Sequence, residues 1–264
     1  RAGALVSMGN TGAVVGASTL GLGTLEGVRR PGIAVTLELS GHPVTLIDMG
    51  ANIAPKPEHL VQYAEMGTIF MRDCFKVKSP RVGLLNIGEE ATKGTDLLKE
   101  AHALLAASGL HFVGNVEGGD VFADHADVVV ADGFTGNVVL KLLEGFSGFM
   151  LELVLSELVR HDVKWSAEAV QSVQKHIDYA EYGGALLLGV QGTVIVGHGR
   201  SDAGAVANAL SFAARAMDAR VNDHIVVPRS IDSGASTASR WSTSSDLKRK
   251  TWRPWSATCL PSIR

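Results

Sequence analysis

The chain of 264 residues lacks the features that mark several common protein classes. Its only two cysteines, Cys74 and Cys259, are far apart in the sequence, which excludes a disulfide-stapled scaffold and a cysteine-rich metal site and favours a reducing compartment such as the cytoplasm. No uninterrupted apolar stretch approaches the roughly 20 residues that a membrane-spanning helix needs. The G-x-S-x-G hydrolase motif, the ATP-binding loop and the dinucleotide-binding turn are also missing.

Charge is spread unevenly along the chain. Residues 229–264 hold seven Lys or Arg, two Asp and nine Ser, so this segment has a net charge of +5, whereas the whole chain has −3. The pattern predicts a folded domain over 1–228 and a basic tail containing Ser and Trp over 229–264, which lacks periodicity and is expected to be disordered. A basic arm for nucleic acid or membrane is the alternative for the tail. The acidic remainder of the chain does not suggest nucleic-acid binding.

Short β-branched runs alternate with helical patterns, which predicts an α/β fold with a layered, largely parallel sheet and flanking helices. The expected strands are Ala4–Ser7, Ile33–Glu38, Val44–Met49, Arg81–Ile87, His111–Val116, Asp127–Ala131 and Thr193–Val196. The expected helices are Thr11–Leu20, Pro57–Arg72, Asp96–Ala107, Asn137–Arg160, Ala167–Ala180 and Ala203–Arg220.

Polar turns rich in glycine follow five of the expected strands. They are Ser7–Asn10, Asp48–Asn52, Asn86–Glu90, Asp132–Asn137 and His198–Gly199. Ligands of open α/β sheets bind beyond the carboxyl ends of the strands. Each turn alone is explained by ordinary turn chemistry, but together they predict a binding site.

The first of these turns lies between a strand and a helix, in the segment SMGNTGAVVG. Free backbone N–H groups and the helix dipole at such a place favour an anion. Ser7, Asn10 and Thr11 add polar side chains, and Gly12 leaves the backbone accessible. The alternative is an ordinary Asn or Thr helix cap.

Other candidate site residues come from the later turns. Lys93 is suited to neutralise a phosphate or a developing oxyanion, or is a solvated lysine paired with a neighbouring glutamate. Asn137 is suited to donate to a carbonyl oxygen, or caps the helix that follows it. His198 is a candidate acid or base near neutral pH, or a structural histidine. The remaining candidates for substrate binding are Asp48, Asn52, Glu89, Asp132 and Thr135.

Seven ordered blocks resemble the bacterial phosphate acyltransferase family of phospholipid synthesis. The blocks are SMGNTGA, DMGAN, PRVGLLNIGEEATKG, VGNVEGGD, DVVVADGFTGNVVLK, YGGALLLGVQGTVIVGHG and the helix with Asn208-Ala209. The resemblance implies a fold similar to phosphotransacetylases and isopropylmalate dehydrogenases. It also implies that a long-chain acyl group passes from acyl carrier protein to inorganic phosphate, in a homodimer with peripheral membrane contact.

With this resemblance, the Ser7–Gly12 turn and Lys93 are expected to hold phosphate, opposite Asn137, which polarises the thioester carbonyl. No metal or cofactor is expected. The family's Asp-x-Met-Gly-Gly-Asp block is absent, so an N-terminal part of the family domain is expected to be missing, and Met8 stands where the family usually has a small residue. Alternatives are a phosphotransacetylase-like transferase that uses acyl-coenzyme A, and an inactive protein that binds lipid or carrier.

Two surface features bear on partners. The segment MRDCFKVKSPR carries Arg72, Lys76, Lys78 and Arg81, a candidate dock for the acidic carrier or simply a solvated charged face. The helix over 143–160 has an apolar stripe, which is typical of a core or dimer interface. The family resemblance adds a shallow contact with lipid as an alternative.

Overall fold

The computed structural model describes residues 2–39, 42–161, 184–199 and 201–225. Within them lie the strands β1 (Ala4–Ser7), β2 (Gly32–Leu39), β3 (His42–Ile47), β4 (Val82–Leu85), β5 (Phe112–Val116), β6 (Val128–Val130), β7 (Ala185–Leu188) and β8 (Thr193–Val196). The helices are α1 (Thr11–Gly21), α2 (Pro57–Phe75), α3 (Asp96–Ala107), α4 (Gly133–Arg160), α6 (Ala203–Asp218) and α7 (Val221–His224), and η1 (Asp120–Phe122) is a short 3-10 turn.

Most expected elements are confirmed with small shifts at their ends, and η1 and α7 were not predicted. Strand β7 was not predicted, because its run of leucines has neither alternation nor β-branched residues. Helix α4 begins at Gly133, one turn before Asn137, because Asp132 caps it. The helix predicted at Ala167–Ala180 and the tail over 229–264 lie outside the described residues.

The strands form one sheet in the order β1-β8-β7-β2-β3-β6-β4-β5. The pairs β1–β8, β3–β6, β4–β6 and β4–β5 are parallel, whereas β2 is antiparallel to β3 and β7, and β7 is antiparallel to β8. The sheet is therefore mostly parallel, as predicted. Strands β1 and β8 nevertheless run opposite to β3, β4 and β6, so their carboxyl ends lie at the other edge.

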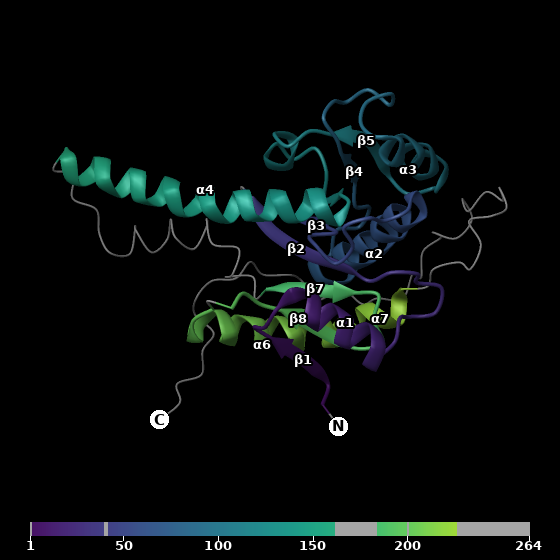
Figure 1. Ribbon diagram of the computed structural model, residues 1–264, viewed down its shortest axis with the longest axis horizontal. Coiled ribbons are helices and arrows are strands. Elements are labelled where there is room, and N and C mark those ends of the chain that lie inside the picture. The colour runs from purple at the N-terminus through teal and green to yellow at the C-terminus, as the bar shows by residue number, and fades with distance from the viewer. Residues whose placement is uncertain (1, 40–41, 162–183, 200, 226–264) are drawn as a thin grey trace.

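Helices cover both faces of the sheet and bury a core on each (Figure 1). One core joins α2, α3, α6 and α7 to one set of strand side chains, and the second joins α1 and the first part of α4 to the alternate set. In β7, for example, Leu186 faces the first core and Leu187 the second, as the twofold repeat of a strand requires. The predicted layered α/β fold is confirmed.

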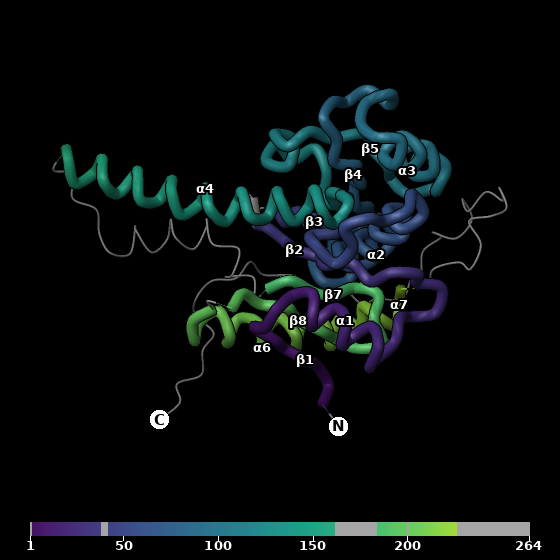
Figure 2. The backbone as a smooth tube through the Cα atoms, in the orientation of Figure 1, coloured from purple at the N-terminus to yellow at the C-terminus, as the bar shows by residue number. Residues whose placement is uncertain are grey.

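Helix α4 has two unlike halves. Its first part packs on the sheet through Val139 and Leu140, and its second part extends beyond the other described helices and strands (Figure 2). The exposed apolar side chains on it are Phe134, Val138, Leu142, Phe146, Phe149, Leu153, Val154 and Val159. No helix in the described part of the chain is both long and apolar enough to cross a bilayer.

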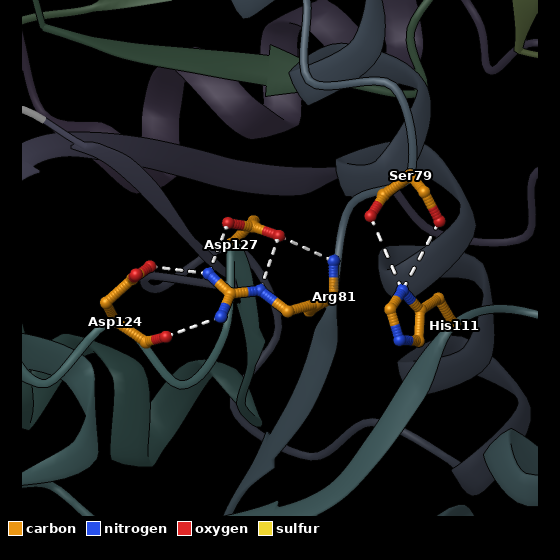
Figure 3. A network of polar contacts seen from close by, with 5 residues as sticks. All are labelled: Ser79, Arg81, His111, Asp124 and Asp127. Carbon is orange, nitrogen blue, oxygen red and sulfur yellow. Dashed lines mark hydrogen bonds and ion pairs between the residues drawn. The ribbon is translucent and has the colours of Figure 1, made fainter.

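An ion-pair network ties the beginnings of β4 and β6 together (Figure 3). Asp127, just before β6, accepts the Arg81 backbone N–H at 2.7 Å and the guanidinium Nε at 3.1 Å and Nη2 at 2.9 Å. Asp124 also pairs with this guanidinium. Beside them, His111 Nδ1 lies 3.3 Å from the Ser79 hydroxyl. Arg81 is thus engaged within the fold and Arg72 pairs with its neighbour Asp73, whereas Lys76 and Lys78 of the predicted basic dock are exposed.

Candidate functional site

A small cleft of about 80 Å³ lies where α4 passes over the sheet. Its floor includes Ile33 and Val35 of β2, and Met49 follows β3. Its polar wall contains three predicted residues from distant parts of the sequence, Thr11, Asn137 and His198. Residues 11 and 205 lie in the first turns of α1 and α6, and 137 lies in the second turn of α4, so the positive ends of three helix dipoles lie near this cleft.

Asn137 is held in place by close backbone packing. Asp132, not Asn137, caps α4, because its Oδ1 accepts the Thr135 N–H at 2.9 Å and its Oδ2 accepts the Thr135 hydroxyl at 2.6 Å. A Cβ on Gly136 would lie 2.0 Å from the Asp48 carbonyl oxygen, and one on Gly50 (φ +129°) would lie 3.4 Å from the Asn137 side chain. The cap alternative for Asn137 is therefore wrong, and its amide lines the cleft.

The carboxylate of Asp48 organises the turn that follows β3. The side chain is completely buried, and its two oxygens accept the backbone N–H groups of Ile33, Gly50, Ala51 and Asn52 at 2.8 to 3.1 Å. Burial raises the pKa of the Asp48 carboxyl, and these four N–H groups oppose that rise. Asp48 therefore supports the turn behind the cleft and does not line the cleft itself.

Asn52 extends the same support toward α4. Its Nδ2 donates to the Pro31 carbonyl oxygen and to the Tyr63 hydroxyl, both at 2.7 Å. Its own carbonyl accepts the Gly133 N–H at 2.9 Å, at the first residue of α4. The predicted residues Asp48 and Asn52 thus contact the protein backbone and fix where α4 begins.

The β1–α1 turn meets the cleft through Met8 and Thr11. The Ser7 hydroxyl accepts the Gly9 N–H at 3.3 Å, and Asn10 Oδ1 caps α1 by accepting the Ala13 N–H at 3.0 Å. Gly12 lies beside this cap and is exposed. Met8 finds room because a Cβ on Gly197 would come within 1.9 Å of its sulfur.

Lys93 does not line this cleft. Its loop follows β4, next to β6 in the sheet, and so lies at the edge where α4 begins. Two buried asparagines hold the loop, since Asn86 Nδ2 donates to the Lys93 carbonyl at 3.1 Å and Asn115 Nδ2 to the Glu90 carbonyl at 2.8 Å. Glu89 is exposed on the same loop. That Lys93 faces the first turn stays a prediction.

Lys141 was not predicted, although it ends the block DVVVADGFTGNVVLK. It lines the cleft one helical turn after Asn137, and its Nζ pairs with Glu144 Oε2 at 2.8 Å. The i, i+4 spacing from Asn137 was the available signal, because it places both side chains on one face of a helix. Among the described residues, no three His, Cys, Asp or Glu side chains are grouped so as to hold a metal ion.

Comparison with known proteins agrees with this architecture. The model of a family described as fatty acid synthesis protein matches residues 1–224. The chain is 45% identical over 231 residues to the phosphate acyltransferase of Thermodesulfovibrio yellowstonii, covering 85% of this chain and 67% of that protein. It is 46% identical over 234 residues to the phosphate acyltransferase of Heliobacterium modesticaldum, covering 85% and 70%.

Solved structures share the fold at low sequence identity. EutD phosphotransacetylase from Staphylococcus aureus is 18% identical with a TM-score of 0.54, covering 83% of this chain and 63% of that one. A branched-chain phosphotransacylase from Enterococcus faecalis V583 is 18% identical with a TM-score of 0.52, covering 81% and 73%. The predicted phosphotransacetylase-like fold is confirmed, and the chain spans about two thirds of the length of its relatives. From the family model and the identities above 40%, the chain belongs to the phosphate acyltransferase family, described as fatty acid synthesis proteins.

Proposed function

We propose that the protein transfers a long-chain fatty acyl group from acyl carrier protein to inorganic phosphate, forming an acyl phosphate for glycerophospholipid synthesis. The observation that carries this proposal is the cleft in which Thr11, Asn137 and His198 meet beneath three helix N-termini. Backbone N–H groups and dipoles of helix N-termini favour anions. Family membership supports the same chemistry.

The reaction needs no nucleophilic side chain. A phosphate oxygen attacks the thioester carbonyl carbon, the carbonyl oxygen becomes an oxyanion, and the C–S bond breaks as the oxyanion collapses. The carrier leaves as a thiolate and takes up a proton. The enzyme's task is therefore to align two anionic substrates and to stabilise the oxyanion.

Each predicted residue has a proposed part in that task. The Asn137 amide donates to the carbonyl oxygen that becomes the oxyanion, and His198 supplies the proton to the leaving sulfur. Ser7, Asn10, Thr11 and Gly12 form the turn that receives phosphate. Lys93 adds positive charge from the loop beside the start of α4, with Glu89 next to it.

Two further residues and two supporting ones complete the proposed site. Asp132 and Thr135 keep the α4 N-terminus in a shape that admits the substrate. Asp48 and Asn52 hold the turn against which Asn137 rests. Their hydrogen bonds to backbone groups support a positioning part for all four.

We also propose a homodimer in the cytoplasm with peripheral contact at the inner face of the membrane. The support is the apolar stripe of α4, defined here as Phe134, Val138, Leu142, Phe146, Phe149 and Leu153, which is exposed along the helix. A stripe at helical spacing is typical of an interface with another protein or with a lipid surface. A lipid surface is a candidate partner because the proposed substrate carries a long acyl chain.

Hydroxylamine trapping tests the reaction, because it converts acyl phosphate into a stable hydroxamate. With phosphate and long-chain acyl carrier protein, the purified protein is expected to give the long-chain hydroxamate. Product from short-chain acyl-coenzyme A alone would support the phosphotransacetylase-like alternative. Binding of the carrier with no hydroxamate from any donor would support an inactive binding protein.

The same assay tests the named residues. Lys93→Ala and Asn137→Ala are each expected to lower kcat/KM by about a hundredfold, the typical effect of removing a group that stabilises developing charge. Lys99→Ala is the matched control for Lys93, because Lys99 is a lysine of the neighbouring helix α3. An unchanged kcat/KM in Lys93→Ala would remove Lys93 from the site while leaving the reaction itself intact.

A further inference from the structure

The cleft contains an ion pair that the proposed chemistry has not yet used. Lys141 and Glu144 both line it, and Lys141 Nζ lies 2.8 Å from Glu144 Oε2. Glu144 is mostly covered, with 16% of its side chain exposed, whereas 54% of the Lys141 side chain is exposed. The lysine is therefore paired with a mostly covered carboxylate and is itself accessible to a ligand.

Lys141 has a distinctive place among the groups of the cleft. Of the described residues that line it, Lys141 is the only lysine or arginine. It shares one helix face with Asn137, and Thr11 and His198 line the same space. Inorganic phosphate carries between one and two negative charges at neutral pH, and a cation within hydrogen-bond reach is its strongest partner.

We propose that Lys141 is a phosphate-binding cation of this site, in addition to Lys93, and that Glu144 holds its ammonium until phosphate displaces the carboxylate. This inference rests on the proposed function for its substrate. An ion pair whose lysine is more than half exposed is weak, so a phosphate that also accepts hydrogen bonds from Thr11 and Asn137 competes successfully for the ammonium. After the exchange, the Glu144 carboxylate repels the bound phosphate. Lys141 thus raises the affinity for phosphate, and Glu144 lowers it.

Opposite effects of two substitutions follow. Lys141→Gln removes the cation and is expected to raise the KM for phosphate by about tenfold. Glu144→Gln removes the competitor and is expected to lower the KM for phosphate by about threefold. Lys141→Arg keeps the charge and is expected to retain most of the affinity. The KM for the acyl donor is expected to stay within twofold in all three.

A second measurement avoids turnover altogether. Phosphate added to the protein alone is expected to raise Tm in proportion to binding. That rise is expected to be lost in Lys141→Gln and to begin at lower phosphate concentrations in Glu144→Gln. Titration with chloride at equal ionic strength separates binding from general salt effects.

The matched control is a pair of the same kind on the same helix. Arg160 Nη1 lies 3.0 Å from Glu157 Oε1 near the far end of α4, away from the cleft. Arg160→Gln and Glu157→Gln are expected to leave the KM for phosphate and the phosphate-dependent Tm unchanged. They report any effect that comes only from losing an ion pair on α4.

Two outcomes would overturn the proposal. One is a Lys141→Gln protein whose phosphate affinity matches that of Arg160→Gln, and the other is a Glu144→Gln protein that loses phosphate affinity as Lys141→Gln does, as a purely structural pair would. If phosphate binding depends on Lys141 but the wild-type protein forms no acyl phosphate, the phosphate site stands and the proposed reaction fails.

Discussion

Arg81 shows how neighbouring side chains change what a charge can do. In the sequence it belongs to a basic segment, but in the fold its guanidinium is surrounded by Asp127 and Asp124 (Figure 3). The Arg81 guanidinium holds the pKa of Asp124 below its ordinary value of 3.8. The charge therefore joins two strands rather than serving a partner.

Replacing Arg81 by Gln is expected to destabilise the fold by about 2 kcal/mol at pH 7, because the partly buried Asp127 carboxylate loses its charged partner. Since the pKa of Asp124 is lower in the folded than in the unfolded state, the stability it contributes is present above about pH 4 and is lost as the pH falls further. Urea unfolding between pH 7 and pH 3 should show the difference between wild type and variant shrinking in acid. Arg220→Gln, which breaks the exposed pair with Asp223, is the control and should cost less than about 0.5 kcal/mol. A pH-independent difference would contradict the assignment.

Helix α4 is positioned by Gly133 and Gly136 at its start, where the backbone packs closely. The glycines farther along the helix lie in open space. A Cβ on Gly136 would meet the Asp48 carbonyl oxygen at 2.0 Å, whereas one on Gly145 meets nothing within 4 Å. The first part of α4 is therefore fixed against the Asp48–Asn52 turn. Asn137 and Lys141 depend on that contact for their place in the cleft.

Gly136→Ala is expected to push α4 away from the turn, with a loss of about 3 kcal/mol in the free energy of unfolding and a fall in acyl phosphate formation. Gly145→Ala should instead stabilise the protein by roughly 0.5 to 1 kcal/mol, since alanine favours the helix. Chemical denaturation and the hydroxamate assay on both variants make the comparison. Equal effects of the two substitutions would show that the start of α4 is not closely packed.

For the molecule as a whole, the exposed apolar stripe of α4 is the candidate surface for contact with a second copy of the chain or with lipid. Its side chains lie on a helix that extends beyond the rest of the described fold (Figure 2), and the polar face includes Glu152 and Glu157. An acidic face does not favour anionic lipid, whereas a second copy of the stripe buries apolar area without that cost.

Phe149→Glu is expected to weaken the proposed dimer, because it places a charge in the stripe. Light scattering measures the mass, and flotation with phospholipid vesicles measures membrane contact. Leu210→Glu, at an exposed leucine of α6, is the control for the added charge. Loss of flotation with an unchanged mass would show that the stripe contacts lipid. No change in either measurement would show that it serves neither contact.

Most of the fold follows from local patterns in the sequence. Helix α3 was predicted with its observed bounds because Thr95 caps it and its apolar positions repeat with helical spacing. The boundary of α4 was misplaced because the block DGFTGN offers two capping side chains, and the choice of Asp132 over Asn137 depends on packing against Asp48.

Amino-acid order alone was sufficient to predict the α/β class and the family, since propensity, caps and motif blocks are local in the chain. Three residues singled out in the sequence, Thr11, Asn137 and His198, line one cleft in the fold. The directions of the strands could not be read in this way. They depend on β2 and β7 inserting antiparallel between the two parallel groups, a pairing of segments more than 150 residues apart. That long-range pairing brings the turn after β1 and the first part of α4 to one cleft, because it decides which segments of the chain lie side by side.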